Sequence, residues 1–349
     1  MAFHDYDALL VLSFGGPEGE DEVIPFLENV TRGRGIPRER LAEVGEHYFH
    51  FGGVSPITAQ NREIIANVED ELTTRGIDLP VYFGNRNWRP FAEDAARRIA
   101  ADGHRRVLVF ATSAWGGYSA CRQYDEDILR LREATPELEF TKLWQFYGHP
   151  DFIRLNAEYL REAVERAEGK RTAILFSAHS VPTAADQASG GPQDSQLYSR
   201  QVAEAARLVA KDAGVDDYEV VWQSRSGNPA TPWLEPDVVD RSLEIHAADR
   251  PEHIICVPIG FITDHMEVVW DLDTELKEAV EDKGMSLDRV PTVGLTKDFA
   301  AMVVDIAENV AQGSTPPTLS EVTVQGCTVN GAPCAAKCCA PAQPKPASA

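Results

Sequence analysis

The chain has 349 residues, of which 43% are hydrophobic and 25% charged, proportions typical of a soluble globular protein with room for two domains. Its 55 acidic and 33 basic residues leave a formal charge of −22, which argues against nucleic acid or an anionic membrane as the main partner, because both are bound by clustered Lys and Arg. No apolar run approaches the ~20 residues that span a bilayer, and residues 1–6 do not form a secretory signal, so we expect no transmembrane segment and a cytoplasmic location.

Short apolar runs alternate with longer amphipathic stretches over most of the chain. Buried strands are expected at 8–12, 81–84, 107–110, 173–176, 218–222 and 254–258. Helical patterns are found at 91–101, 152–167, 196–213 and 237–248. Such alternation is typical of parallel sheets covered by helices, so we predict an α/β fold with doubly wound, Rossmann-like sheets.

Each half of the chain carries a set of these strand and helix units. We predict an N-terminal doubly wound domain at 1–146 and a C-terminal one at 147–296, which face each other across a cleft. A helix at 297–312 is expected to pack back on the body. A Cys-rich extension follows at 313–339, and the Pro- and Ala-rich end, 340–349, is expected to be a disordered tail.

A histidine directly follows one of the buried strands. Ligands of open α/β sheets bind at the carboxyl ends of the strands, and nearly every apolar run here ends in small or polar residues. His179, within the segment 177–182, takes such a position. An imidazole there can accept a proton near neutral pH or ligate a divalent metal, although a single histidine more often has a structural role.

A row of carboxylates follows the strand at 254–258. Glu267, Asp271 and Glu275 are spaced i, i+4, i+8, so on a helix they line one face. A solvated acidic face is the structural explanation, but like charges at this spacing weaken an isolated helix. The functional explanation, which we favour, is a path of hard oxygen ligands that leads a cation such as Fe²⁺ inward, with Glu267 at its inner end.

The cysteines are unevenly placed along the chain. Cys121 and Cys256 stand alone, and the other four lie close together near the C-terminus: Cys327, Cys334, Cys338 and Cys339. Four clustered thiolates can hold a zinc ion or a [2Fe–2S] cluster. The alternative is a vestigial tail that binds no metal.

Several of these segments together resemble the ferrochelatase family. Three family signatures occur in the family's order: residues 177–182, then 222–224 with 232–236, then 258–261 with 264–267. The resemblance extends to residues 15–17, 32–34 and 52–56, and so covers most of residues 5–312. Each fragment alone is weak evidence, and together they are specific.

The resemblance implies two doubly wound, chelatase-like domains around a porphyrin cleft, and a lyase that inserts Fe²⁺ into a porphyrin in haem biosynthesis. The family's catalytic pair falls on His179 and Glu267. His179 would take a pyrrole proton or ligate the entering iron, and Glu267 would deliver the metal or carry protons outward. Asp271, Glu275 and His47 match a peripheral metal path.

The resemblance also indicates residues that contact the porphyrin. Some members place a tyrosine iron ligand in the loop after the first strand, where this chain has Phe14; Tyr124 is our substitute, with packing on a helix as its alternative role. The propionates need hydrogen-bond donors, and tryptophans can stack on the ring, with core packing as their alternative role. The porphyrin-binding candidates are Ser55, Tyr124, Arg32, Arg34, Phe14, Trp222 and Trp233.

The family contains enzymes that use coproporphyrin III and enzymes that use protoporphyrin IX. Protoporphyrin enzymes at a membrane often carry an apolar lip, whereas residues 32–50 are largely polar here. Phe14 with Tyr124 and the C-terminal cysteines also resemble the coproporphyrin-using enzymes of Gram-positive bacteria. We therefore expect Fe²⁺ and coproporphyrin III as substrates; protoporphyrin IX is the first alternative, and a cobaltochelatase and a non-catalytic haem carrier are more remote.

Many ferrochelatases carry a C-terminal [2Fe–2S] cluster, which the resemblance implies here. In the commonest pattern one ligand comes from an internal helix, where this chain has Asn156. All four ligands would then have to come from Cys327, Cys334, Cys338 and Cys339. As for partners, we expect a monomer that makes transient contacts with other haem-pathway enzymes and binds no nucleic acid.

Overall fold

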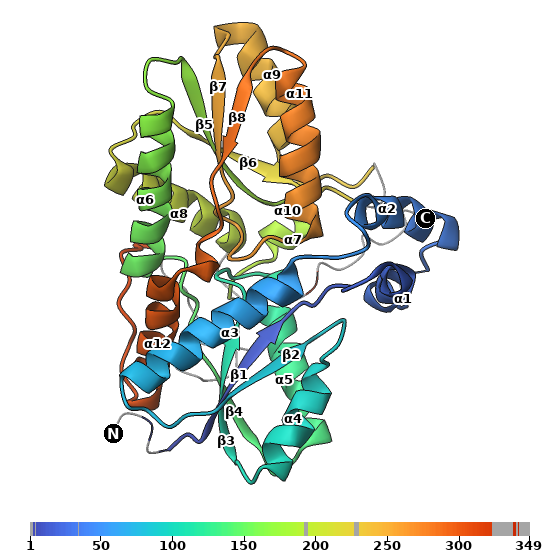
Figure 1. The fold of residues 1–349 in the computed structure, drawn as a ribbon, viewed down its shortest axis with the longest axis vertical. Helices are drawn as coiled ribbons and strands as arrows, with labels where there is room; N and C mark the ends of the chain where they lie inside the picture. Colours follow the sequence, from blue (N-terminus) through green and yellow to red (C-terminus); the bar gives the residue numbers. More distant parts are fainter. Residues whose placement is uncertain are drawn as a thin grey trace.

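The computed structural model describes residues 3, 5–33, 35–191, 195–226, 230–322, 338–339 and 341. It contains two four-stranded parallel sheets flanked by helices, which confirms the predicted fold class. The strand order is β2-β1-β3-β4 in the first sheet and β6-β5-β7-β8 in the second, so both halves have the same topology. Figure 1 shows the second sheet above the first.

The first sheet is built from β1 (Ala8–Ser13), β2 (Val81–Asn85), β3 (Arg106–Ala111) and β4 (Glu139–Lys142). Because side chains alternate across a strand, Leu10 of β1 packs with α4 (Ala92–Ala101) and α5 (Gln123–Ala134), whereas Leu9 packs with α3 (Ile57–Thr74). Every residue of β1 is buried, as expected for a strand inside a sheet covered on both faces.

The second sheet is built from β5 (Thr172–His179), β6 (Glu219–Gln223), β7 (His253–Val257) and β8 (Ser286–Arg289). One face is covered by α6 (Pro150–Arg166) and α8 (Leu197–Ala213), and the other by α9 (Val238–Asp249) and a helix that begins at Met266. Shorter elements are α7 (Thr183–Gln187) and the 3₁₀ turn η3 (Val293–Leu295).

The helix that begins at Met266 contains a π-helical turn. It runs through α10 (Met266–Trp270), the π segment η2 (Asp271–Leu276) and α11 (Lys277–Glu281) without a break. A second irregular segment, η1 (Tyr118–Arg122), has a kink at Ala120 and leads into α5. π-Helical turns are rare and occur frequently at functional sites.

The last helix, α12 (Lys297–Ala311), connects the two halves. It packs beside α3 from the first half and α6 from the second (Figure 1). Arg75, at the end of α3, donates to Asp305 Oδ1 at 2.5 Å and to Glu308 Oε2 at 3.1 Å on α12. Helix α12 therefore holds one half of the molecule against the other.

Helices α1 (Glu20–Val30) and α2 (Arg38–His50) form a hairpin at one side of the body, away from both sheets (Figure 1). Their small apolar cluster includes Val23, Phe26 and Leu41. The end of α2 approaches α10, because the His47 ring stacks on Trp270 with centroids 4.0 Å apart. Among the helices of the described ranges, none is both long and apolar enough to cross a membrane.

Candidate active site

His179 is the last residue of β5, and its strand neighbours β6 and β7 lie on either side. Its carbonyl accepts a hydrogen bond from Tyr198 Oη at 2.8 Å. The loop after β7 passes very close to β5, because Gly260 N–H donates to Ser177 O at 3.0 Å. A Cβ at Gly260 would lie 2.7 Å from Ala178 Cα, so only glycine fits there. The loops after three neighbouring strands thus converge on this imidazole.

Glu267 lies directly opposite the imidazole. His265 caps the helix by accepting the Glu267 N–H at Nδ1, 3.1 Å away. The Glu267 carboxylate then places its Oε2 at 3.2 Å from His179 Nε2. The structure therefore brings together the two residues that the sequence predicts as a pair, although they are far apart in the chain.

The pair is an ion pair at neutral pH. Burial alone would lower the pKa of His179, but the charge and hydrogen bond of Glu267 outweigh it and raise that pKa to about 9. Burial would likewise raise the pKa of Glu267, but the His179 charge holds it at about 2. The two side chains remain 34% and 54% exposed, so a ligand can reach both.

Asp271 extends the site away from His179. Burial, and then the charges of Glu267 and Glu275, raise the pKa of Asp271 to about 7, against the opposing hydrogen bond from Ser224 Oγ. Gln223 Nε2 lies 3.4 Å from Asp271 Oδ2 and 3.3 Å from the Glu267 carbonyl. A carboxyl group that titrates near neutral pH is suited to transfer protons.

Gln223 and Ser224 are site residues that the sequence analysis did not single out. Gln223 is the last residue of β6, the strand beside β5, and Ser224 follows it, so their polar side chains at a carboxyl end were the available signal. Ser224 has a φ of 64°, a left-handed conformation that a residue other than glycine keeps only where its surroundings hold it. Its bond to Asp271 is consistent with that restraint.

The outer end of the carboxylate row is less open than predicted. Trp270 Nε1 donates to Glu275 Oε1 at 2.9 Å, and the His47 ring stacks on Trp270. Burial lowers the pKa of His47, although the Glu275 charge opposes this. In the part of the chain that the structure describes, no three His, Cys, Asp or Glu side chains are grouped to hold a metal. The peripheral metal path stays a prediction.

The first half contributes Phe14 and Tyr124. Phe14 follows β1 and is 39% exposed, with its ring edge-on to Phe26. Tyr124 is 5% exposed; its hydroxyl lies 3.2 Å from Thr112 Oγ1 and the Arg86 guanidinium lies 4.7 Å from its ring centroid. This environment favours the packing role that the sequence left open for Tyr124. Its contact with the porphyrin stays a prediction.

The two tryptophans have different surroundings. Trp222 is 6% exposed on β6 and packs on Tyr198 at 5.7 Å between centroids, which favours core packing rather than stacking on a porphyrin. Trp233 is half-buried and forms an isolated β-bridge with Pro182. Pro182 belongs to the loop that directly follows His179. Trp233 is therefore the better candidate of the two for stacking on a porphyrin.

The candidates for propionate binding lie at the start and end of helices. Ser55, just before α3, is buried, and its N–H donates to Pro17 O at 2.9 Å. That N–H is thus occupied, and the contact of Ser55 with a propionate stays a prediction. Arg32 is exposed just after α1, and Arg34 lies outside the described residues.

Two of the predicted cluster ligands, Cys327 and Cys334, also lie outside the described residues. Cys338 and Cys339 are buried, with their sulfur atoms 3.9 Å apart. They pack with Cys121, which is isolated from the other cysteines in the sequence. Asn156, the position of the family's internal ligand, is buried in α6 and donates to Phe152 O of the same helix at 2.8 Å.

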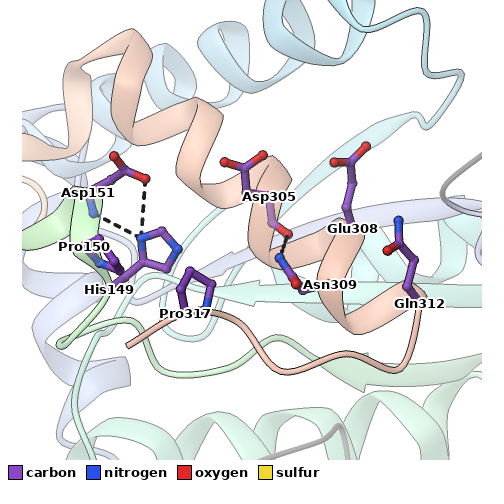
Figure 2. Close-up of a pocket in the computed structure, with 8 residues that line it drawn as sticks. All are labelled: His149, Pro150, Asp151, Asp305, Glu308, Asn309, Gln312 and Pro317. Carbon is purple, nitrogen blue, oxygen red and sulfur yellow. Dashed lines mark hydrogen bonds and ion pairs between the residues drawn. The ribbon is translucent and has the colours of Figure 1, made fainter. Parts of the chain in front are cut away.

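A cavity of about 290 Å³ lies elsewhere, between the start of α6 and α12 (Figure 2). His149 caps α6 there by accepting the Asp151 N–H. The acidic groups that line the cavity are already paired: Arg154 contacts Asp151, and Arg75 contacts Asp305 and Glu308. None of the predicted site residues lines it, and we assign it no role in the chemistry.

Known proteins resemble this chain over most of its length. Residues 6–311 match the family model described as Ferrochelatase. A protein of Corynebacterium glutamicum (strain R) is 54% identical over 97% of this chain and 93% of its own, and one of Nocardia farcinica is 54% identical over 98% and 99%. One of Mycolicibacterium smegmatis is 50% identical over 96% and 99%. All three are named coproporphyrin III ferrochelatase.

Similar solved structures include SirB from Bacillus subtilis with Fe³⁺, with a TM-score of 0.53 at 14% identity over 87% of this chain and 96% of that one. The sirohydrochlorin chelatase SirB from Bacillus subtilis subspecies spizizenii, in complex with cobalt, gives a TM-score of 0.50 at 12% identity over the same shares. At these identities the likeness concerns the fold alone.

Proposed function

This chain belongs to the ferrochelatase family, and we propose that it inserts Fe²⁺ into coproporphyrin III in haem biosynthesis. The substrate follows from the relatives that are 50–54% identical over nearly the full chain and carry that name. The site observation that carries the proposal is the pairing of His179 with Glu267 at the carboxyl ends of the second sheet. Iron is the substrate, and the enzyme is a lyase.

Metal insertion requires groups that accept the protons released by the porphyrin. The porphyrin gives up two pyrrole N–H protons as Fe²⁺ enters, and the resulting dianion balances the metal charge. At neutral pH His179 already holds a proton, because Glu267 raises its pKa. When the cation approaches, it reduces the attraction of the Glu267 carboxylate for that proton, so the pKa of His179 falls. His179 then releases its proton outward, to Asp271 or to water, and the neutral imidazole can accept a pyrrole proton.

Asp271 is the next group on the outward path. Its pKa of about 7 lets it gain and lose a proton near neutral pH, and it lies within the influence of the Glu267 charge. Ser224 and Gln223 orient its carboxyl group. We assign Asp271 to proton transfer rather than to metal binding, because a half-protonated carboxyl group is a poorer ligand for a cation.

The alternatives are less well supported. The relatives' names favour coproporphyrin III over protoporphyrin IX, and iron over cobalt. A haem carrier has no use for the carboxylates beside His179. As finer points, we propose a cytoplasmic monomer that makes transient contacts with other haem-pathway enzymes. We also propose a [2Fe–2S] cluster at the C-terminal cysteines, since the two described ones are buried side by side.

Replacing His179 with alanine tests the function. The H179A variant should bind coproporphyrin III, seen in its absorption and fluorescence, but insert Fe²⁺ more slowly by about 10² to 10⁴-fold. His104→Ala, at the loop before β3, is the matched control and should behave as wild type. Insertion by H179A at the wild-type rate would contradict the assignment, and a wild-type protein that binds haem but inserts no metal would be a carrier.

A further inference from the structure

Arg289, the last residue of β8, contacts two acidic side chains on either side of Glu267 in the chain. Its Nε donates to Asp273 Oδ1 at 2.8 Å and its Nη2 donates to Asp273 Oδ2 at 2.7 Å, which makes a bidentate pair. Its Nη1 donates to Asp264 Oδ1 at 3.0 Å. We call Arg289, Asp264 and Asp273 the Arg289 clamp. The clamp connects the loop that precedes Glu267 to the helix that follows it.

Little water reaches the clamp, because the Arg289 side chain is 15% exposed and that of Asp264 is 19% exposed. Leu287, two residues before Arg289 on β8, packs with the apolar cluster between the sheet and this helix, so Arg289 points to the same face. An ion pair on the open surface adds little, because water and salt screen it. A largely buried fork of two parallel hydrogen bonds instead fixes the position of both partners.

Asp264 is also held from the first half of the molecule. Its backbone N–H donates to Gln60 Oε1 at 2.7 Å, and Gln60 Nε2 lies 3.4 Å from Asp264 Oδ2. Gln60 is in α3, which covers the first sheet. The loop before Glu267 is therefore bound from two sides, by Gln60 of the first half and by Arg289 of the second.

The π turn after Glu267 is held from two sides as well. Side chains two residues apart point to nearly opposite sides of a helix, so Asp271 and Asp273 face in different directions. Asp271 accepts a hydrogen bond from Ser224, which follows β6, and Asp273 is bound by Arg289 of β8. Strands β6 and β8 are the two edges of the second sheet. The helix is thus fixed at both edges of the sheet that it covers.

The position of this helix decides how Glu267 meets His179. The Glu267 Oε2 atom lies 3.2 Å from His179 Nε2, and the backbone of the helix determines where that carboxylate starts. A displacement of about 1 Å at a reacting group can slow a reaction about 10²-fold. A lysine in place of Arg289 would keep the positive charge, but its single ammonium cannot form the fork with Asp273 and the bond to Asp264 in the same geometry.

We propose that Arg289 is a positioning residue for Glu267. It fixes the loop before this carboxylate and the π turn after it, and it acts through Asp264 and Asp273 rather than by contact with the porphyrin or the iron. The expected effect on the rate rests on the insertion reaction proposed above. The restraint on the helix does not depend on that reaction and is measured separately.

The test compares full-length wild type with Arg289→Lys. The kcat for iron insertion should fall by about tenfold or more, whereas the KM for coproporphyrin III should stay within about twofold of wild type. Amide hydrogen exchange should become about tenfold faster in residues 266–276 and stay unchanged in α12. Arg166→Lys is the matched control and should behave as wild type, because Arg166 pairs with Asp288 on the other face of β8.

Asp273→Asn breaks the fork from its other side and leaves the bond from Arg289 to Asp264. It should also lower kcat at an unchanged KM, and it decides the matter if Arg289→Lys does not fold.

An unchanged kcat in the folded variant would overturn the proposal. Faster exchange throughout the protein would overturn it too, because it would show a general role in stability. If wild type inserts no iron, the proposed function fails, and the exchange of residues 266–276 alone decides: exchange in Arg289→Lys equal to that in wild type would then overturn the clamp.

Discussion

The His179 imidazole and the Glu267 carboxylate both lose hydration in the site, which disfavours their charged forms. The opposite charge of each partner offsets part of this desolvation cost for the other. His179 Nδ1 also faces the carbonyl of Ser180, so both ring nitrogens have acceptors and the imidazolium is well matched to its position. The consequence is a histidine that is a poor base in the resting enzyme. When a cation neutralises Glu267, the pKa of His179 falls, and the imidazole loses its proton and is free to accept another.

Replacing Glu267 with glutamine tests this coupling. Without the carboxylate charge, burial dominates, so the pKa of His179 should fall from about 9 to below its ordinary 6.5. The measurement is a titration of the His179 imidazole by nuclear magnetic resonance in wild type and E267Q. Glu275→Gln, farther along the helix, is the control and should change the pKa of His179 little. A His179 pKa that does not move in E267Q would refute the coupling.

The raised pKa of Asp271 predicts that the free energy of unfolding depends on pH. Its pKa is raised from the ordinary 3.8 to about 7, so between these values the native state binds more protons than the unfolded state. The contribution of Asp271 to stability is therefore fully present below about pH 4 and is lost as the pH rises through about 7. Asp271→Asn mimics the protonated form and lacks this loss.

The melting temperatures of wild type and D271N should therefore diverge as the pH rises. D271N should gain on wild type between about pH 4 and about pH 7, and the difference should level off above that range. Asp282→Asn, near the end of the same helix, controls for a general charge effect. A difference between D271N and wild type that is the same at every pH would show that the pKa of Asp271 is not raised.

Among the elements, the helix from Met266 to Glu281 shows how local geometry shapes the site. The i, i+4, i+8 argument assumed a regular α-helix, but Asp271 begins a π-helical turn. The charges of Glu267 and Glu275 still both act on Asp271, so the three carboxylates remain neighbours. The wider turn has no signal in residue type, which is why the sequence could not indicate it.

The close approach of the loop after β7 to β5 predicts the effect of a single methyl group. Gly260→Ala places a Cβ 2.7 Å from the backbone of Ala178, next to His179, so it should destabilise the fold by about 1–3 kcal/mol and slow insertion. Urea unfolding measures the first effect. Gly45→Ala in α2 is the matched control, since its Cβ would meet only side-chain ends at 3.2 Å or more and should be neutral or stabilising. Equal stability of G260A and G45A would contradict the packing argument.

For the whole molecule, the two halves are fixed together at the site as well as at α12. Trp115 Nε1 from the first half donates to Gly260 O at 2.8 Å, and Asp264 N–H donates to Gln60 Oε1 at 2.7 Å. These bonds connect the loop that precedes Glu267 to the first half. A shift between the halves would therefore alter the position of the carboxylates relative to the first sheet.

The sequence predicted β1, β2, β3, β5, β6 and β7, because each contains an apolar run, although β2 and β6 lie at sheet edges. It missed the other two edge strands, β4 (Glu139–Lys142) and β8 (Ser286–Arg289), because they are largely polar and show no such run. Helices α1 and α2 were also not identified.

At the site, position after a strand made His179 a candidate, and the family resemblance indicated it more strongly. Helical spacing with Asp271 and Glu275 gave Glu267 support of its own. The burial of Trp222 and Tyr124 was not predictable, because a residue on a strand or helix can face either the core or a ligand. The packing of Cys121 with Cys338 and Cys339 is a tertiary feature that no local pattern encodes.

The central claim concerns the reaction of the whole enzyme, and an anaerobic insertion assay tests it most directly. Purified protein is given Fe²⁺ with coproporphyrin III or with protoporphyrin IX, and formation of the iron porphyrin is followed by absorption. We predict turnover with coproporphyrin III that exceeds turnover with protoporphyrin IX by about tenfold or more in kcat/KM. A preference for protoporphyrin IX, or no insertion into either porphyrin, would contradict the account.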